Sequence, residues 1–538
     1  MIRIVFLCKD TEGGEGVSRP SFIRRSRFEE LDEIGVTGKE VKEEKKMIRL
    51  RIKDKSYIYD VFHIVKAFFP NEIVGQEIHE EQELFLELDV CGKEHTCRIC
   101  VEAEELAPYE TKKEKKQYLD RKVYRALAEY SGKTLAWGIL TGIRPTKIAM
   151  KMLEEKMEES EIQKNLMEQY LMSEEKARLG IEIAKREKTQ LEQLDYEEGY
   201  SFYVGIPFCP TTCAYCSFTS YPIAAWKKRV DEYLDALCKE ISYVGAISKA
   251  KKLNTIYIGG GTPTTLEADQ LDRLLTHLED TFSYEEIKEI TVEAGRPDSI
   301  TREKLEVLKR HKIPRISINP QTMQQKTLDL IGRKHTVEDI LRVYGMAREL
   351  EFENINMDLI AGLPGETVED VKDTLRQIEA LSPDSITVHS LAVKRASRLA
   401  QMPELKEAAL QEERGRQMEM MIDLAAESAA RMGMKPYYLY RQKNIAGNFE
   451  NVGYAKVDKA GIYNILIMEE KQSIVAVGAG ASTKAVFSAA EDQLKNGQPG
   501  QERRLEKRIE RVENVKDVGQ YIARIDEMIE RKGELLWH

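Results

Sequence analysis

Three cysteines lie within eight consecutive positions, in the segment Cys209-Pro-Thr-Thr-Cys213-Ala-Tyr-Cys216. Three thiolates on one tight loop can bind three irons of a [4Fe–4S] cluster and leave the fourth iron open to a substrate or cofactor. A structural zinc site and ordinary buried thiols are the alternatives. Zinc usually takes a fourth Cys or His nearby, and none follows within this loop. We therefore expect the three cysteines to be cluster ligands.

A run of glycines, Gly259-Gly260-Gly261-Thr262-Pro263, ends the β-rich stretch TIYIGGG. Consecutive glycines let the backbone approach a ligand closely and present amides to a carboxylate or an amino group. An ordinary turn is the alternative, and a phosphate loop is disfavoured because no Gly-Lys-Ser/Thr follows. Since the run ends a strand beside the cysteine loop, we expect it to contact a ligand.

Polar residues also lie at the ends of the following β-rich stretches. Glu293 ends the third stretch and Gln321 the fourth, Arg333 follows shortly after, and Asp358 lies in the fifth. A charge inside a barrel strand is costly unless it is paired or meets a ligand. An ion pair between Glu293 and Arg333 is the alternative explanation. Four polar residues on successive strand ends favour a shared polar ligand.

The elements that carry these residues alternate between β-rich and helical patterns. The β-rich stretches are FYVGIP, TIYIGGG, EITVEAG, RISINPQ, INMDLIAG and SITVHSL. Helices between them begin at Thr336 and Thr367, each followed three residues later by an Asp, which is a helix-capping pattern. Such alternation predicts parallel strands joined by helices. We expect an α/β fold with a partial (β/α)6 barrel, whose chemistry lies at the carboxyl ends of the strands.

The rest of the chain divides around this barrel. We expect a charged extension outside the fold (1–46, with Met47 as an alternative start), an N-terminal α+β and then helical domain (47–195), the partial barrel (196–395), a C-terminal α+β domain (396–490) and a helical tail (491–538). In the N-terminal domain, a hairpin is expected around Gly92. In the C-terminal domain, GIYNILIMEE and SIVAVGAGAS read as β-like stretches.

Composition limits the classes of function. The 538 residues include 42% apolar and 32% charged residues, and the formal net charge is -10, which argues against non-specific nucleic-acid binding. No apolar run reaches about 18 residues, so no membrane span is expected. Eight cysteines in a chain of this length do not make a disulfide scaffold. Together with the lack of a signal peptide, this predicts the reducing cytoplasm.

Several motifs in order carry a resemblance to a known family. YVGIPFCPTTCAYCSF, GGGTPT, TVEAGRPD, RISINPQT, IGRKH and MDLIAGLPGET resemble those of the oxygen-independent coproporphyrinogen III oxidase group (HemN/HemW-like) of radical S-adenosylmethionine (SAM) enzymes. The resemblance covers roughly residues 200 to 485. LAWGILTGIRPTKIA and the long N-terminal region make the chain most similar to the HemZ, or coproporphyrinogen dehydrogenase, branch.

The resemblance implies cofactors, site residues and a reaction. The cofactors would be a [4Fe–4S] cluster and SAM, with flavodoxin or ferredoxin as reducing partner. The positions that match SAM-binding ones are Tyr203, Gly260, Gly261, Thr262, Glu293, Gln321, Arg333 and Asp358, with Ala392 and Ser482 as fainter matches to a second SAM site. A 5′-deoxyadenosyl radical would abstract hydrogen from a propionate of coproporphyrinogen III, which then loses CO2 to leave a vinyl group.

The chain departs from the pattern of the oxidases at two places. Ser217 and Phe218 follow the third cysteine where the oxidases carry a further Cys, and Gly205 replaces a His. In having Phe218 at this position, the chain resembles the haem-chaperone (HemW) branch. That branch, however, has a His-Asn-x-x-Tyr-Trp haem motif where this chain reads Ile462-Tyr463-Asn464-Ile465-Leu466. A haem chaperone, or a radical SAM enzyme acting on another tetrapyrrole, is therefore the alternative to a dehydrogenase.

Weaker signals have structural alternatives. Cys91, Cys97 and Cys100 are expected to be ordinary thiols, because Cys97 and Cys100 point to opposite faces of a strand. Arg144 and Lys147 could bind propionates, but a helix start near Pro145 explains them equally. His389 could face the cavity or be a core residue, and aromatic residues at 437, 438 and 440 could stack on a tetrapyrrole or pack their domain.

Overall fold

The computed structural model describes residues 47–70, 72–81, 83–91, 96–394, 397–401, 412–442, 449–487 and 508–537. Its centre is a partial barrel of six parallel strands. These are β5 (Gly199–Ile206), β8 (Lys252–Gly260), β9 (Glu289–Gly295), β10 (Arg315–Ile318), β11 (Ile355–Ala361) and β12 (Ser385–Ser390). Each strand pairs in parallel with the next one along the chain. The predicted partial (β/α)6 barrel is confirmed.

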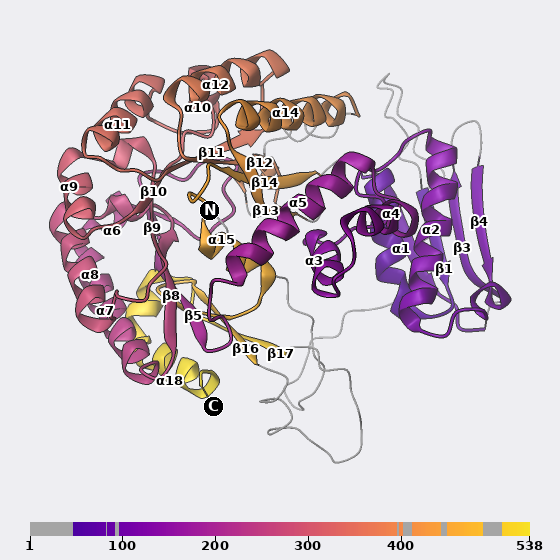
Figure 1. Cartoon of the computed structure of the whole chain (residues 1–538), viewed down its shortest axis with the longest axis horizontal. Coiled ribbons are helices and arrows are strands. Elements are labelled where there is room, and N and C mark those ends of the chain that lie inside the picture. Colours follow the sequence, from indigo (N-terminus) through magenta and orange to yellow (C-terminus); the bar gives the residue numbers. More distant parts are fainter. Residues whose placement is uncertain are drawn as a thin grey trace, which may run out of the picture.

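Helices join consecutive strands and cover the outer face of the barrel (Figure 1). They are α7 (Val230–Ile247), α8 (Ala268–Thr281), α9 (Arg302–Arg310), α11 (Val337–Glu349) and α12 (Val368–Leu381), with the short α10 (Gln325–Leu330) before α11. Thr336 and Thr367 each accept from the backbone of the Asp three residues later, which forms the predicted capping boxes. The apolar faces of these helices pack on a continuous core of strand residues.

Segments from the C-terminal region extend the barrel sheet at both edges. Next to β5 lie β15 (Ser473–Val477), which is parallel to it, and then β16 (Ser482–Phe487) and β17 (Arg508–Glu513). Next to β12 lie β14 (Glu450–Ala455) and β13 (Lys435–Arg441), preceded by α14 (Glu412–Arg431). The region expected as a helical tail therefore also contributes a strand, followed by α17 (Val518–Ala523) and α18 (Ile525–Leu535), which pack on α7.

One C-terminal element differs in type from the prediction. The stretch GIYNILIMEE, expected to be β-like, forms the helix α15 (Ile462–Glu469), which lies in the middle of the barrel in Figure 1. Its first backbone amides, of Ile462 and Tyr463, donate to the carboxylate of Glu289 in β9. A short apolar run fits a buried strand and a buried helix equally well, and the carboxylate at the helix N-terminus favours the helix here.

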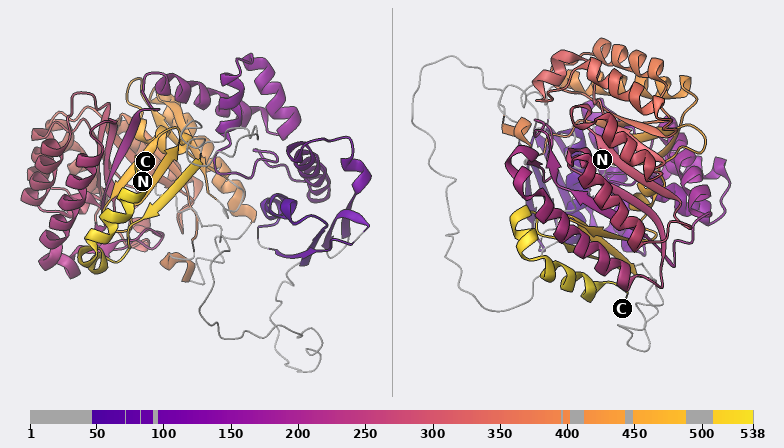
Figure 2. Two further views of the ribbon diagram at one scale, coloured as in Figure 1. Left: turned by 90° about the horizontal axis from the view of Figure 1, so that it is seen from below. Right: turned by 90° about the vertical axis from the view of Figure 1, so that its left-hand side faces the viewer.

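The N-terminal domain lies at the opposite end of the molecule from the barrel helices (Figure 2). Its sheet has the order β2 (Ile73–Ile78), β1 (Met47–Ile52), β3 (Leu84–Cys91), β4 (Thr96–Glu102). The predicted β3–β4 hairpin is confirmed, although Gly92 and residues 1–46 lie outside the described residues. Helices α1 (Lys55–Phe68), α2 (Lys112–Ser131), α3 (Thr146–Glu154), α4 (Glu159–Tyr170) and α5 (Glu174–Leu191) lead to the barrel. None of the described helices is long and apolar enough to cross a bilayer.

Candidate functional site

The cysteine loop follows β5 and lies beside the glycine run. Cys209 ends the two-residue strand β6 (Phe208–Cys209), which pairs with β7 (Tyr221–Pro222). Its Sγ lies 3.5 Å from Oγ1 of Thr262. Cys213 is buried, with 7% of its surface exposed. The structure therefore brings together two of the motifs that the sequence singles out.

Backbone and side-chain hydrogen bonds hold this loop against the segment before Arg333. The amide of Ala214 donates to the carbonyl of Ile331 at 2.8 Å, and Oγ1 of Thr211 donates to the carbonyl of Gly332 at 3.2 Å. The amide of Leu399 in turn donates to the carbonyl of Ala214 at 2.8 Å. The loop is thus fixed on two sides.

The glycine run is shaped by close approaches that a side chain would block. Gly260 has a φ of +111°, and a Cβ there would lie 3.2 Å from the hydroxyl of Tyr203. A Cβ on Gly261 would lie 2.4 Å from the carbonyl oxygen of Phe208. A Cβ on Gly259 would lie 2.9 Å from the carboxyl carbon of Glu293. The run therefore packs directly between β5 and β9, with Tyr203 and Glu293 on either side.

Glu293 occupies the inner face of β9 and is 1% exposed. The hydroxyl of Tyr257 donates to its Oε1 at 2.6 Å. Burial raises the pKa of the Glu293 carboxyl, because the charged form loses its hydration. A ligand cation at this place would stabilise the carboxylate.

Gln321 and Asp358 are joined through the backbone. Gln321 has a φ of +69°; its amide donates to the carbonyl of Asp358, and its carbonyl accepts from the amide of Ile360, both at 2.9 Å. The Asp358 carboxylate accepts from Nδ2 of Asn356 at 2.8 Å and lies 3.8 Å from Nε2 of His389. His389 therefore faces the cavity side of the barrel, next to a predicted site residue.

Arg333 lies on the cysteine-loop side of the barrel and is 5% exposed. One guanidinium nitrogen donates to the carbonyl of Asn319, and the other donates to the hydroxyl of Tyr215 at 3.2 Å. Among the described residues, its Nε has no hydrogen-bond partner and its guanidinium forms no ion pair. The alternative that Glu293 and Arg333 pair with each other is wrong.

The two fainter predicted positions lie at the margin. Ala392 is half-buried just after β12, where the amide of Leu391 donates to the carbonyl of Ala361 at 3.0 Å. Ser482 is exposed and pairs with Glu513 in the β16–β17 ladder. The structure does not bring Ser482 to the residues described above.

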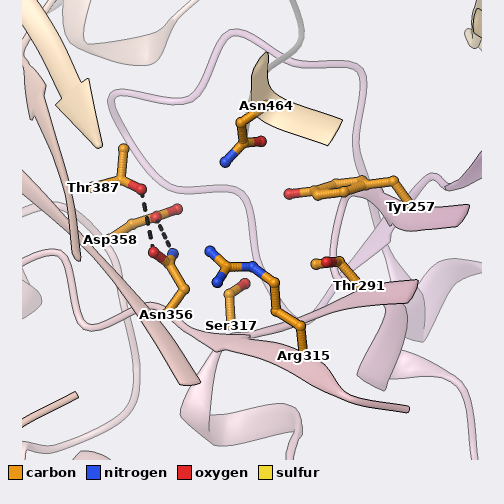
Figure 3. A pocket seen from close by; sticks show the side chains of 8 residues that line it. All are labelled: Tyr257, Thr291, Arg315, Ser317, Asn356, Asp358, Thr387 and Asn464. Atoms are coloured by element: carbon orange, nitrogen blue, oxygen red, sulfur yellow. Dashed lines mark hydrogen bonds between the residues drawn. The ribbon is translucent and has the colours of Figure 1, made fainter. Parts of the chain in front are cut away.

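The barrel encloses a small polar cavity, and of the residues that line it the sequence predicts only Asp358 (Figure 3). Side chains from five strands and from α15 line it: Tyr257, Thr291, Arg315, Ser317, Asn356, Asp358, Thr387 and Asn464. A signal for them exists in the sequence. Polar residues recur at every second position of the strands, as in Thr291 and Glu293, or Asn356 and Asp358, and alternate residues of a strand share a face.

The basic residues of the GIRPTK segment have structural partners. Pro145 caps α3, as the helix-start explanation predicts. Arg144 donates to the carbonyl of Met468 at 2.8 Å and pairs with Glu470, and Nζ of Lys147 lies 3.5 Å from the same carboxylate. These cations lie at the C-terminal end of α15, where they oppose the negative end of the helix dipole.

Replacing Arg144 with alanine should therefore lower stability and leave substrate affinity unchanged. A charge-assisted contact is worth about 1.5–3 kcal/mol, which should appear as a lower free energy of unfolding in urea. Arg178→Ala is the control, because Arg178 forms an exposed pair with Glu174 on the surface of α5 and should cost less than about 0.5 kcal/mol. An increase in KM without a loss of stability would contradict this assignment.

The remaining weak signals are also structural. Tyr437 and Tyr438 are each 1% exposed inside the C-terminal core, and the Tyr440 hydroxyl lies 3.0 Å from Nδ1 of His389. They pack their domain and leave no ring face open to a tetrapyrrole. Among the described residues, no three His, Cys, Asp or Glu side chains are arranged around a single ion. Cys97 and Cys100 lie three residues apart in β4, which places their side chains on opposite faces of that strand.

The residues present fit the expected cofactors. Three thiols on one anchored loop can each take one iron of a [4Fe–4S] cluster, which needs a wider spacing than ligands of one ion. SAM carries an ammonium and a carboxylate on its amino-acid part. Glu293 offers a buried carboxylate for the first, and the Nε of Arg333, which has no partner in the described part of the chain, offers a donor for the second.

Comparisons with known proteins show which family the chain resembles. Residues 203–378 match the radical SAM superfamily. The chain is 45% identical over 364 residues to the oxygen-independent coproporphyrinogen-III oxidase-like protein HemZ of Bacillus subtilis, and the match covers 67% of this chain and 72% of HemZ.

Two other relatives match over shorter stretches. The heme chaperone HemW of Bacillus subtilis is 38% identical over 195 residues, or 36% of this chain and 51% of HemW. The oxygen-independent coproporphyrinogen III oxidase of Escherichia coli is 33% identical over 196 residues, or 36% of this chain and 42% of that enzyme. On its long match to HemZ, the chain belongs to the oxygen-independent coproporphyrinogen III oxidase-like group of radical SAM enzymes, whose cofactors are a [4Fe–4S] cluster and SAM.

Proposed function

We propose that this radical SAM enzyme oxidatively decarboxylates propionates of coproporphyrinogen III to vinyl groups, in the cytoplasm. Each propionate loses CO2, one hydrogen atom and one electron. The cluster and SAM, when bound, supply the radical that takes the hydrogen atom. The electron passes to an acceptor, and flavodoxin or ferredoxin reduces the cluster. Support comes from the relatives named as coproporphyrinogen oxidases or oxidase-like proteins.

We assign roles to the chain's residues accordingly. The three loop cysteines bind the cluster. Glu293 holds the ammonium of SAM and Arg333 its carboxylate, because their charges are complementary to these groups and both side chains are buried. The other SAM contacts are Tyr203, Gly260, Gly261, Thr262, Gln321 and Asp358, with Ala392 at the edge of the site.

The proposal of a carboxylated substrate rests on a cation that lies beside the cysteine loop. Lys394 follows β12 and is half-buried, and its Nζ lies 5.8 Å from the ring centre of Phe218. Phe218 is two residues beyond Cys216. Among the described residues, no carboxylate lies within ion-pair distance of Lys394. A propionate placed there would have its charge balanced while its apolar carbons met the phenyl ring.

Anaerobic turnover tests the substrate and this cation together. The reconstituted enzyme is incubated with SAM, a reductant, an electron acceptor and coproporphyrinogen III. It should release CO2 and 5′-deoxyadenosine and form a tetrapyrrole with two fewer carboxylates, which mass spectrometry identifies. Lys394→Gln should raise KM about tenfold, the effect of losing one charge-assisted contact. Lys326→Gln, which removes a surface cation paired with Asp370, should leave KM unchanged. Cleavage of SAM without decarboxylation would refute the proposal.

A haem-delivery function is the second candidate, because the heme chaperone HemW is also a relative. The segment aligned with the haem motif argues against it. Here that segment is α15, whose Tyr463 is 2% exposed and stacks on Tyr257, and whose Asn464 donates to the hydroxyl of Tyr437 at 3.0 Å. Both side chains lie inside the barrel and contact other side chains there. Tight, stoichiometric haem binding without turnover of coproporphyrinogen III would favour the chaperone.

A further inference from the structure

Arg296 connects the end of β9 to the cysteine loop. It is 3% exposed and directly follows Gly295. Its Nη1 donates to the carbonyl of Thr211 at 2.7 Å and to the Thr211 hydroxyl at 2.8 Å. The same nitrogen donates to Sγ of Cys213 at 3.7 Å. One guanidinium thus contacts both the backbone of the loop and the sulfur of a cluster ligand.

The other edge of the guanidinium is held by Asp298. Nε and Nη2 of Arg296 donate to the two oxygens of this carboxylate at 2.9 and 2.6 Å, which is a bidentate pair. Nδ1 of the fully buried His335 lies 3.6 Å from the same carboxylate. Because the fork is fixed on one edge, the nitrogen on the other edge has a fixed direction toward the sulfur. The short 3-10 helix at Pro297–Ser299 carries Asp298.

The geometry points to Arg296 as a positioning residue that sets the reduction potential of the cluster. A cationic N–H donor to a ligating sulfur stabilises the more negative, reduced cluster, so it raises the potential. The same contacts fix the loop before the cluster binds. This role goes beyond the proposed decarboxylation, because it requires the family's cluster and no particular substrate.

Redox titration of the reconstituted cluster, followed by electron paramagnetic resonance without substrate, tests this role. Arg296→Gln should shift the midpoint potential to more negative values by about 59 mV, which is a tenfold weaker preference for the reduced state in a one-electron couple. Arg296→Lys should shift it in the same direction but less, because the charge remains while the fixed fork is lost.

Arg310→Gln is the matched control, since Arg310 is a surface arginine of the following helix and pairs with Asp272; its midpoint should equal that of the parent. If Arg296→Gln folds, as judged by circular dichroism, and yet retains little iron, that result would support the loop-positioning role. The midpoint potential of the cluster would then be measured on Arg296→Lys instead. Unchanged midpoints in both Arg296 variants with full iron content would overturn the inference. A chain that failed to decarboxylate coproporphyrinogen III would still show these shifts, so the two proposals fail separately.

Discussion

Replacing Cys213 with alanine should abolish the cluster. The parent chain, reconstituted anaerobically, should bind about four irons and four sulfides and show a broad absorbance that bleaches on reduction. A cubane held by only two thiolates loses a third of its protein ligands. Cys213 also lies in the middle of the anchored loop, between the other two cysteines. Iron content should therefore fall to background, and SAM cleavage with it.

Other cysteines of the chain provide the controls. Cys238 is 9% exposed on α7, and Cys97 is half-buried in β4, so both are thiols that solvent reaches poorly. Cys238→Ala and Cys97→Ala should retain the full iron and sulfide content. Full iron in the Cys213 variant would remove the basis for the cluster assignment, whereas loss of iron in a control would point to a folding defect.

The second large effect is expected at Glu293. Glu293→Gln keeps an acceptor for the Tyr257 hydroxyl, which donates to Oε1 at 2.6 Å, so the fold and the cluster should persist. It removes the negative charge that we place opposite the ammonium of SAM. The loss should be about 1.5–3 kcal/mol, or roughly a ten- to hundredfold weaker affinity for SAM, measured by equilibrium binding to the reconstituted protein.

The pH dependence of SAM binding distinguishes a charge contact from a packing defect. Burial raises the pKa of Glu293 above its ordinary value. SAM would bind the ionised form of Glu293. The affinity for SAM should therefore fall as the pH falls through this raised pKa, and it should be constant at higher pH. Glu293→Gln should lack this dependence. Glu306→Gln, an exposed change on α9, is the control and should bind SAM as the parent does. If Glu293→Gln also bound SAM with the affinity of the parent, the role of Glu293 would be structural.

The sequence by itself determined the barrel and its cluster loop, because both depend on local patterns. Strand and helix periods alternate over short stretches, and Thr336 and Thr367 cap their helices with an Asp three residues away. The three cysteines are close in the chain, so their spacing already places them on one loop. Polar residues at the strand ends follow from the parallel topology, since all the carboxyl ends meet at one edge.

Only the tertiary structure decided the elements whose partners are distant in sequence. The segment of α15 is mostly apolar, and its helical form depends on the carboxylate of Glu289, which lies 173 residues before Ile462 in the chain. The ion pair considered between Glu293 and Arg333 is absent from the described residues because their neighbours are Tyr257 and Tyr215 instead. Arg296 reaches Cys213 across 83 residues. Contacts of this kind arise from packing between strands, and no local period encodes them.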